Sequence, residues 1–429
     1  MSTKVKVLLV GPLCNISGYS EHARVLMDSL MGLEDEIDLY VQTTQWAAAT
    51  WDLKYYEKYK SFIDKTNNLF HSRRDENGNV RLEGFFDASF QVKPPNEFEK
   101  ISNNDVGVTA ALETTFAPSQ WVPKCNLMKH IFVVSDHAKD NLKNAKGPQG
   151  ERVATPITVI PYGYDNSIEK EDIYKDLDIT TSLNFLTIAQ LAPRKNFENT
   201  LKWFVEQHED NADAGLIVKT HFLNNSTLDF YEIQGRVKAI LDSVNPDRKC
   251  KIYLLHGNFT EQQMVGLFDP DVVDCYITLT HGEGFGIPIF HAACNSIPVI
   301  ATNWSGHLDF LRAPSKNKAG KTKYKSHFLK VDYDISSVQK SHLMPDLITP
   351  DCKWAYPRES SFKKNMRIIQ ANASEAKEDA KNLSEYLLDK FSIENIHKQY
   401  REETIKVLPQ TSQLQNDVDD MFEALSLED

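Results

Sequence analysis

The chain has 429 residues, which is too long for one ordinary hydrophobic core and predicts two domains of roughly 150 to 250 residues each. Hydrophobic residues make up 41% and charged residues 25%, values that exclude long disorder and a fibrous class. The formal net charge of −12 argues against a protein that binds polyanions over its whole surface, although a local basic cleft stays open.

Short β-branched or aliphatic runs bounded by turn residues recur along the chain and suit strands buried on both faces of a parallel sheet. In chain order they cover residues 5–10, 106–110, 131–134, 157–160, 185–189, 216–219, 251–255, 275–279 and 298–301. Segments of helical period lie between many of these runs. Ala23, Leu26 and Leu30 share one helix face, and residues 260–263 form a capping box ahead of another helix.

Strand and helix alternate twice, which predicts an α/β fold of two doubly wound, Rossmann-like units. We expect the first unit at 1–168, with an insertion at about 51–104, and the second at 183–400. A polar linker at 166–182 joins them, and a charged helical tail over 401–429 is expected to pack back on the first unit. Residues 51–104 and 315–351 lack clear periodicity, and we interpret both stretches as insertions or long surface loops.

The cysteines and the apolar runs bear on the compartment. The six cysteines show no CxxC pair and no zinc-like spacing with histidine, so we expect buried thiols in a reducing compartment. The apolar run at 5–10 is too short for a secretion signal, and no run reaches the roughly 18 residues of a membrane span. We therefore predict a cytoplasmic protein without a membrane span.

The segment 281–301 carries the strongest chemical signal, because a strand, a glycine turn, a helix and another strand follow one another. Glycines let backbone N–H groups approach an anion, and the helix N-terminus adds partial positive charge. The predicted phosphate contacts are Gly284, Phe285, Gly286 and Ile287. Glu283 stands at the mouth of the turn, where it could accept hydrogen bonds from sugar hydroxyls. On the glycines alone, a capping Glu283 beside a merely tight turn remains open.

The run that starts at Glu283, EGFGIPIFHAACNSIPVIAT, resembles the donor-site signature of the family 4 glycosyltransferases, which are large retaining GT-B enzymes. Further segments resemble this family in the same order: 11–30, 113–115, 131–135, 159–165, 189–196 and 354–369. The resemblance covers most of the chain. It implies two domains facing a cleft, a nucleoside-diphosphate sugar (UDP- or GDP-linked) as donor substrate, retention of configuration and no required metal.

Two positions depart from the family pattern. The second Glu of the signature, which usually grips the ribose hydroxyls, is replaced by His291. A neutral imidazole can accept one such bond and donate another, and we expect it in the first helical turn, where the dipole keeps it neutral. Alternatively His291 packs locally in a degenerate site. Gln190 stands where the family often has an arginine that binds the diphosphate, whereas Lys195 matches the family lysine and Arg194 either adds a second cation or points to solvent.

Four residues of the first unit complete the predicted site. Gly18 is expected to let its loop approach the leaving phosphate, and Tyr19 and His22 are expected close to donor or acceptor. Glu113 is predicted to orient the acceptor hydroxyl. Two alternatives stay open: His22 is a core or surface histidine, and Glu113 caps a loop. The predicted catalytic residues are Glu283, Lys195, Glu113 and His22.

The sequence thus predicts a retaining, metal-independent glycosyltransferase with a hydroxyl acceptor, which could be a glycan, a small molecule or modified DNA. One alternative is the same chemistry on hydroxylated or hydroxymethylated bases of phage DNA, because residues 17–24 loosely resemble phage proteins of this kind. Another is a non-catalytic nucleotide- or glycan-binding relic, prompted by Gln190 and His291. Asp269 and Asp271 form a DxD pattern, which we interpret as a turn rather than a metal site.

Overall fold

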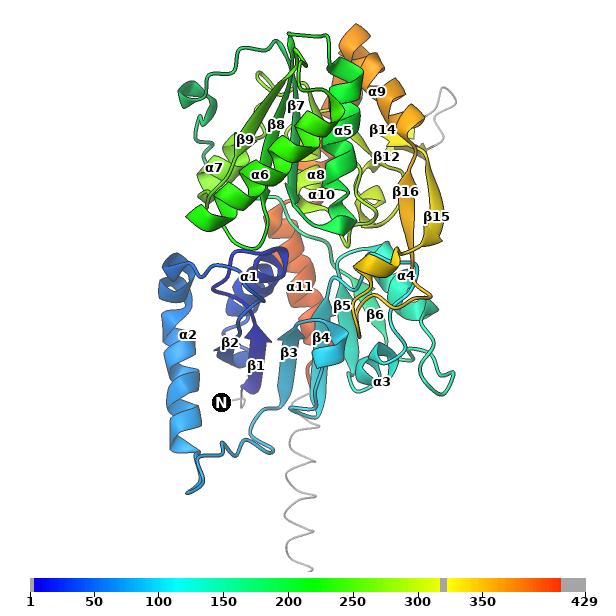
Figure 1. Cartoon of the computed structure of the whole chain (residues 1–429). Coiled ribbons are helices and arrows are strands. Elements are labelled where there is room, and N and C mark those ends of the chain that lie inside the picture. The colour runs from blue at the N-terminus through cyan, green and yellow to red at the C-terminus, as the bar shows by residue number, and fades with distance from the viewer. Residues whose placement is uncertain (1–3, 317–321, 410–429) are drawn as a thin grey trace, which may run out of the picture.

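The computed structural model of the protein describes residues 4–316 and 322–409. It contains two six-stranded parallel sheets, each the centre of one domain, stacked one above the other in Figure 1. The first sheet has the order β2 (Ile37–Thr43), β1 (Val5–Gly11), β3 (Ala88–Val92), β4 (Asn104–Thr109), β5 (His130–Val133), β6 (Ile157–Val159). The second has the order β14 (Leu329–Val331), β11 (Val299–Thr302), β10 (Cys275–Thr278), β7 (Leu183–Gln190), β8 (Ala214–His221), β9 (Lys251–Leu255).

The helices follow the strands that the apolar runs predict, so that each crossover packs back on its own sheet. In the first domain these are α1 (Gly18–Met31), α2 (Leu53–Ser72), α3 (Trp121–Cys125) and α4 (Asp136–Asn144). The second domain has α5 (Phe197–His208), α6 (Thr227–Val244), α7 (Glu261–Gly266), α8 (Ile287–Cys294), α9 (Glu359–Ala371) and α10 (Ser374–Lys390). None of the helices in residues 4–316 and 322–409 combines the length and apolar character needed to cross a membrane.

The interpretation of residues 51–104 as an insertion or long loop is wrong. This stretch contains α2 and the strand β3, which pairs with β1 on one side and β4 on the other. β3 does not look apolar because Ser89 and Gln91 alternate with its hydrophobic residues, yet both are fully buried. Ser89 Oγ donates to Asp105 Oδ1 at 2.7 Å, and Gln91 Nε2 donates to the carbonyl of Glu99 at 2.7 Å. Tertiary partners thus satisfy polar groups that a sequence pattern assigns to solvent.

The stretch 315–351 is likewise more than a loop, because it supplies β14 to the second sheet. It also supplies β15 (Tyr333–Ser337), which forms an antiparallel pair with β16 (Lys353–Pro357). The segment between these two strands reaches the first domain, where Trp121 Nε1 donates to the carbonyl of Asp346 at 3.1 Å. The Thr115 N–H donates to the carbonyl of Lys353 at 3.2 Å. This hairpin therefore ties the two domains together on one side.

The last described helix, α11 (Ile393–Val407), returns to the first domain and lies beside α1 (Figure 1). Ile396 and Tyr400 are buried in the core of that domain. The predicted boundary at 400/401 therefore falls inside α11. The apolar face of this helix that packs on the first domain already begins at Ile396. Of the predicted tail, residues 410–429 lie outside the described part.

The two chain crossings between the domains meet at one point. The Tyr164 N–H donates to the carbonyl of Phe391 at 2.8 Å, and the Ile393 N–H donates to the carbonyl of Tyr164 at 3.0 Å. A Cβ on Gly163 would lie 2.8 Å from the Ile393 Cα, so only glycine permits this approach. The crossings are thus hydrogen-bonded to each other rather than independent.

Candidate functional site

The glycine turn lies between β10 and α8, at the carboxyl end of a central strand, where parallel sheets bind their ligands. Gly286 caps the N-terminus of α8 with φ +96°, a conformation that favours glycine, and Pro288 occupies the first turn as predicted. The backbone N–H groups of Gly284, Phe285 and Gly286 donate to no other group among the described residues. All three residues are buried. Since buried N–H groups rarely stay unpaired, these donors mark a place for a bound acceptor group.

Two neighbouring segments hold this turn in place. The Glu283 N–H donates to Ser305 Oγ at 2.8 Å, and Ser305 itself adopts φ +87°, a strained conformation for a residue with a side chain. A Cβ on Gly306 would lie 2.0 Å from the Gly284 carbonyl oxygen, so the loop after β11 presses directly on the turn. From the first domain, Ser135 Oγ donates to the same carbonyl at 2.5 Å. The turn is therefore fixed before any ligand binds.

A cluster of two cations and two carboxylates lies beside the turn. Lys195 Nζ is 2.7 Å from Glu283 Oε1 and 2.8 Å from Oε2, and Arg194 Nη1 is 3.3 Å from Glu283 Oε2. Arg194 Nη2 reaches across to Glu113 Oε1 of the first domain at 3.1 Å. Arg194 thus points into the site rather than to solvent. Four of the sequence-predicted residues are brought together here by segments far apart in the chain.

The local geometry explains how Arg194 and Lys195 reach Glu283. Both lie in a short turn that Pro193 starts and Asn196 ends in the left-handed conformation, with φ +51°. Asn196 Nδ2 donates to the carbonyl of Leu279 at 3.0 Å, which ties this turn to the end of the β10 segment. Burial alone would raise the pKa of Glu283, but the charges of Lys195 and Arg194 lower it to about 2. The carboxylate is therefore ionised at every physiological pH.

The first domain contributes the loop before α1 to the same region. Gly18 is exposed, and a Cβ at this position would lie 3.6 Å from Ile287 Cδ1 at the start of α8. Tyr19 Oη forms a 2.9 Å hydrogen bond with Thr109 Oγ1 and accepts from the Ala110 N–H at 3.3 Å. Ala110 in turn faces Gly284, where a Cβ would lie 2.9 Å from the Ala110 oxygen. Gly18 and Tyr19 therefore flank the glycine turn across the domain boundary.

Comparison with known proteins shows which solved structures have a similar arrangement of domains. No family model matches the chain, and no curated protein matches its sequence. Similar solved structures include a glycosyltransferase from Rickettsia africae, with TM-score 0.61 and 12% identity over 95% of this chain and 100% of that one. HepE of Anabaena, in complex with UDP and glucose, gives TM-score 0.60 and 12% identity over 94% and 100%. Sucrose-phosphate synthase of Thermosynechococcus elongatus gives TM-score 0.60 and 13% identity over 94% and 99%.

The chain has the GT-B fold. The prediction of two Rossmann-like α/β domains that face each other is confirmed by these structures and by the two parallel sheets. At 12 to 13% identity the likeness shows the fold alone, so residue roles in this GT-B protein rest on its own geometry.

His22 does not join the other candidates in the GT-B structure. Its side chain is buried, with 2% of the residue exposed, and its Nε2 forms a 2.7 Å hydrogen bond with the Tyr400 hydroxyl of α11. Burial lowers the pKa of His22 to about 3, so the ring is neutral. The structure therefore places His22 between α1 and α11, in agreement with the core-histidine alternative, and its proposed catalytic role finds no support in this geometry.

His291 lies in the last turn of α8, not in the first turn as predicted, because this helix has only eight residues. The helix dipole argument is therefore wrong, since a C-terminal turn favours the charged ring. Burial nevertheless lowers the pKa of His291 to about 4, so the ring is neutral for another reason. The ring lies edge-on to Tyr164 at 5.4 Å and to Phe268 at 5.6 Å and forms no hydrogen bond among the described residues.

Two other positions take local roles in the GT-B fold. Gln190 Nε2 donates to the carbonyl of Phe222 at 2.7 Å and so braces the loop after β8. Asp269 Oδ1 accepts from the Asp271 N–H at 2.9 Å, which is the turn expected for the DxD pattern. Within the described part of the chain, no three His, Cys, Asp or Glu side chains gather closely enough to hold a metal ion.

Sequence reasoning missed Ser135, Ser305 and Trp46, all of which lie in loops at the carboxyl ends of strands. Ser305 and Gly306 directly follow β11, next to the strand that precedes the glycine turn, so their position in a parallel sheet was the available signal. Ser135 caps α4, and this common capping pattern gives no indication in the sequence of its bond to Gly284. Trp46 stacks on Tyr19 with ring centroids 4.1 Å apart, and no motif marks it.

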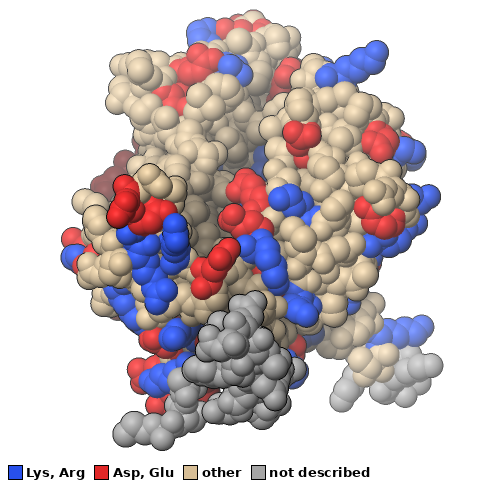
Figure 2. Space-filling view, turned by 90° about the horizontal axis from the view of Figure 1, so that it is seen from below, with Lys and Arg blue, Asp and Glu red and all other residues tan. Residues whose placement is uncertain are grey.

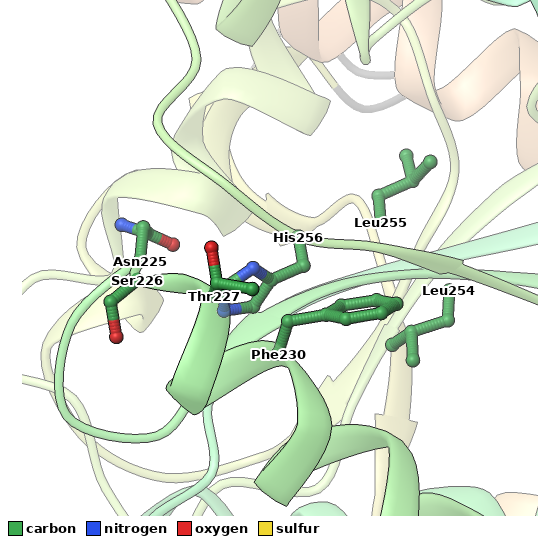
Figure 3. Close-up of a pocket in the computed structure, with 7 residues that line it drawn as sticks. All are labelled: Asn225, Ser226, Thr227, Phe230, Leu254, Leu255 and His256. Carbon is green, nitrogen blue, oxygen red and sulfur yellow. The ribbon is translucent and has the colours of Figure 1, made fainter.

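A separate cavity of about 390 Å³ opens at the edge of the second sheet (Figure 3). It lies between the start of α6 and the end of β9 and is lined by Asn225, Ser226, Thr227, Phe230, Leu254, Leu255 and His256. Beside it, Asp229 Oδ2 is 2.9 Å from His256 Nε2 and 2.9 Å from the Phe222 nitrogen. Asp229 Oδ1 accepts from Leu223 and Asn224. The Asp229 carboxylate is thus fully used in holding the loop after β8.

Proposed function

We propose that the protein is a retaining, metal-independent glycosyltransferase that moves a sugar from a UDP- or GDP-linked donor to a hydroxyl acceptor in the cytoplasm. The observation that carries this proposal is the set of N–H groups at Gly284, Phe285 and Gly286, which have no acceptor in residues 4–316 and 322–409, beside Lys195 and Arg194. Together they form a fixed set of hydrogen-bond donors and cations that suits a diphosphate. The GT-B fold and the UDP and glucose in the HepE complex support UDP as the first nucleotide to test.

In this mechanism the donor diphosphate takes over the bonds that Glu283 now receives from Lys195. As the bond between the sugar and the diphosphate breaks, negative charge grows on the leaving phosphate oxygens. Lys195, Arg194 and the turn N–H groups stabilise that charge without reorganisation, because Ser305, Gly306 and Asn196 already hold them in place.

The carboxylate of Glu283, once released, faces the donor sugar and accepts hydrogen bonds from its hydroxyls. Glu113 remains on the first domain beside Arg194, where it orients the acceptor hydroxyl through its own oxygen. Close contact between Ala110 and Gly284 excludes water from the reacting atoms, so that the acceptor competes with fewer water molecules for the sugar.

Reducing conditions fit this proposal. All six cysteines are buried and none forms a disulfide. Burial raises the pKa of Cys125 to about 12 and keeps that thiol protonated and unreactive. A protein that keeps six separate thiols is best suited to a cytoplasmic environment.

The proposal is tested by a thermal-shift screen with UDP-, GDP- and ADP-sugars, followed by turnover of the sugar nucleotide that stabilises the protein most. Lys195→Ala is expected to lower turnover at least ~100-fold, because one charged donor to the leaving phosphate is lost. Lys202→Ala is the matched control, since Lys202 lies on the exposed face of α5, 48% exposed and paired only with Glu206. Equal turnover in the two variants would contradict the assignment.

The same experiment tests the alternative of a non-catalytic nucleotide- or glycan-binding relic, which the departures at Gln190 and His291 suggest. A non-catalytic protein would gain thermal stability with a nucleotide sugar but would hydrolyse none of it in the absence of acceptor. Measurable release of UDP or GDP from wild type, abolished in Lys195→Ala, would exclude the relic.

A further inference from the structure

The loop between β2 and α2 presents two tryptophans at the domain boundary. Trp46 is half-buried and stacks on Tyr19 with an interplanar angle of 18°. Trp51 is 44% exposed, which is unusual for so large an apolar side chain. We refer to Tyr19, Trp46 and Trp51 as the aromatic platform. It lies at the carboxyl ends of β1 and β2, so it belongs to the side of the first sheet that faces the second domain (Figure 1).

A network of amides holds this loop rigidly. Asn15 is fully buried; its Oδ1 accepts from the Trp46 N–H at 3.1 Å, and its Nδ2 donates to the carbonyl of Ala49 at 3.2 Å. Gln45 accepts from Trp51 Nε1 and donates through Nε2 to the Ala49 carbonyl at 2.9 Å. The buried amide of Asn15 and the exposed amide of Gln45 together hold the loop that carries the two indole rings and leave Trp51 in solvent. Such preorganisation is the feature of a binding surface rather than of a packing defect.

The platform is connected to the candidate donor site through Tyr19. The Tyr19 hydroxyl accepts from the Ala110 N–H, and Ala110 faces Gly284 of the glycine turn. A molecule that rests on Trp46 and Trp51 therefore lies next to the opening at Gly18, the exposed glycine that faces Ile287. This is where an acceptor must be held if a sugar is to pass to it from the second domain.

The charges nearby select the class of acceptor. Arg24 is committed to the carbonyls of Leu13 and Asn15 at 3.1 and 2.9 Å, and Lys54 is paired with Glu261 at 2.7 Å. The carboxylate of Glu21, partly buried in the first turn of α1, forms no ion pair or hydrogen bond among the described residues. A site for single-stranded or flipped nucleic acid combines base stacking with cations that are free to contact phosphate. Arg24 and Lys54 already have partners within the protein. A neutral sugar ring needs an apolar face and carboxylate acceptors instead.

The rest of the first domain agrees with this selection. On the face seen in Figure 2, Lys and Arg are interspersed with Asp and Glu. At the end of α2, a cavity of about 490 Å³ is lined by Arg73, Arg74 and Arg81, but also by Asp75 and Glu76. Arg81 Nη2 lies 3.4 Å from Asp75 Oδ2. Basic residues of this domain are thus balanced by acidic neighbours rather than arranged as a phosphate track.

We infer that the aromatic platform is the acceptor subsite and that the acceptor is a carbohydrate, with a pyranose ring stacked on Trp51 and Trp46. This inference rests on the proposed function, because it takes the glycine turn as the donor site. The hydroxyl that receives the sugar projects past Tyr19 toward Glu113, while the platform fixes the ring behind it. Specificity among acceptors would then depend on which face of the ring can lie against the indoles.

The test uses the full chain labelled with 5-fluorotryptophan, which gives one ¹⁹F signal for each of the six tryptophans. Signals are assigned with Trp→Phe variants. The protein is titrated first with UDP and then, with UDP present, with methyl glycosides of glucose, galactose and N-acetylglucosamine at millimolar concentrations. A duplex that contains 5-hydroxymethylcytosine is titrated in parallel at low salt.

At least one glycoside is expected to shift the Trp46 and Trp51 signals and to leave those of Trp121 and Trp354, which are fully buried, unchanged. Trp51→Ala should raise the Kd of that glycoside at least ~10-fold, because about 1.4 kcal/mol of stacking corresponds to this factor. Tyr231→Ala is the matched control, since Tyr231 is also an exposed aromatic residue, 63% exposed on α6.

Three outcomes would overturn a claim, and each overturns a different one. If UDP binds but no glycoside shifts Trp46 or Trp51, the carbohydrate subsite is wrong and the donor site stands. If only the modified duplex shifts them, the acceptor is nucleic acid. If neither UDP nor GDP, titrated in the same way, binds the protein, the proposed function fails, and any glycoside shifts then describe the platform alone.

Discussion

Two carboxylates at the carboxyl end of the second sheet offer an instructive comparison. Asp229 is surrounded by backbone N–H groups of its own loop and by His256, and its pKa lies at about 2. Glu283 is surrounded by Lys195 and Arg194, and its pKa also lies at about 2. The two groups are equally acidic, so the pKa shift by itself does not separate a functional carboxylate from a structural one.

What separates them is the presence of unused partners. Around Asp229, the donors in contact with the carboxylate are the N–H groups of the loop that it closes and the ring of His256. Around Glu283, two cations arrive from another segment, one of them shared with Glu113, and three N–H groups next to it have no acceptor in the part of the chain that the structure describes. A charge cluster with spare donors is able to exchange a side-chain partner for a ligand, whereas a saturated cluster is not.

The largest expected effect comes from removing the functional carboxylate. Glu283→Ala should lower turnover at least ~100-fold, because the contact to the donor sugar is lost and two cations are left without their partner. Steady-state kinetics with the sugar nucleotide found in the screen measure the effect. Retained turnover in Glu283→Ala would show that Glu283 is not a functional carboxylate.

The structural carboxylate should respond in the opposite way. Asp229→Asn is expected to lower the free energy of unfolding by about 1 to 3 kcal/mol, since the loop N–H groups lose a charged acceptor. Turnover at a temperature well below the transition should stay within ~3-fold of wild type. Urea unfolding and kinetics on the same preparation measure both quantities. A loss of turnover without a loss of stability would reverse the assignment.

A smaller effect is expected at His291. His291→Ala should weaken UDP binding by up to ~10-fold, because one hydrogen bond to the ribose is lost, whereas His291→Glu should restore an acceptor and weaken it less. Calorimetric titration with UDP gives both affinities. Identical affinity in wild type and both variants would show that His291 only packs against Tyr164 and Phe268.

The smallest effect concerns the domain boundary. Asp309 accepts from the Asp136 N–H of the first domain at 2.7 Å, and burial raises its pKa to about 6. The folded protein therefore binds a proton between about pH 4 and pH 6 that the unfolded chain does not, so stability falls as pH rises through this window. Asp309→Asn should raise Tm at pH 7.5 by about 2 °C or more and leave it unchanged at pH 4. Equal shifts of Tm at both pH values would rule out titration of Asp309 as the cause.

The sequence predicted the fold where strands are apolar on both faces, as in β1 and β10. It failed at β3, where Ser89 and Gln91 are buried against partners that only the folded chain brings near. It also placed the boundary of the last unit too late, because the apolar face of α11 binds the other domain.

The predicted site divides in the same manner. Lys195 and Glu283 stand in local patterns with physical meaning, so they could be selected from sequence. Glu113 was also selected, but its contact with Arg194 could not be foreseen, and Ser135 and Ser305 were missed, since these three residues reach the site from separate loops. His22 was selected for its place after a glycine loop, but the helix turns it toward Tyr400.

The paired crossings at Tyr164 and Phe391 to Ile393 restrict how this GT-B protein can open. Two covalent links that touch at one place allow rotation about that place but resist separation there, so we expect displacement to grow with distance from it. The Lys54 and Tyr55 contacts to Glu261, where α2 meets the start of α7, would then break before the crossings do. Admission of a donor would be decided at these peripheral contacts, which makes their strength a determinant of the association rate rather than of the chemical step.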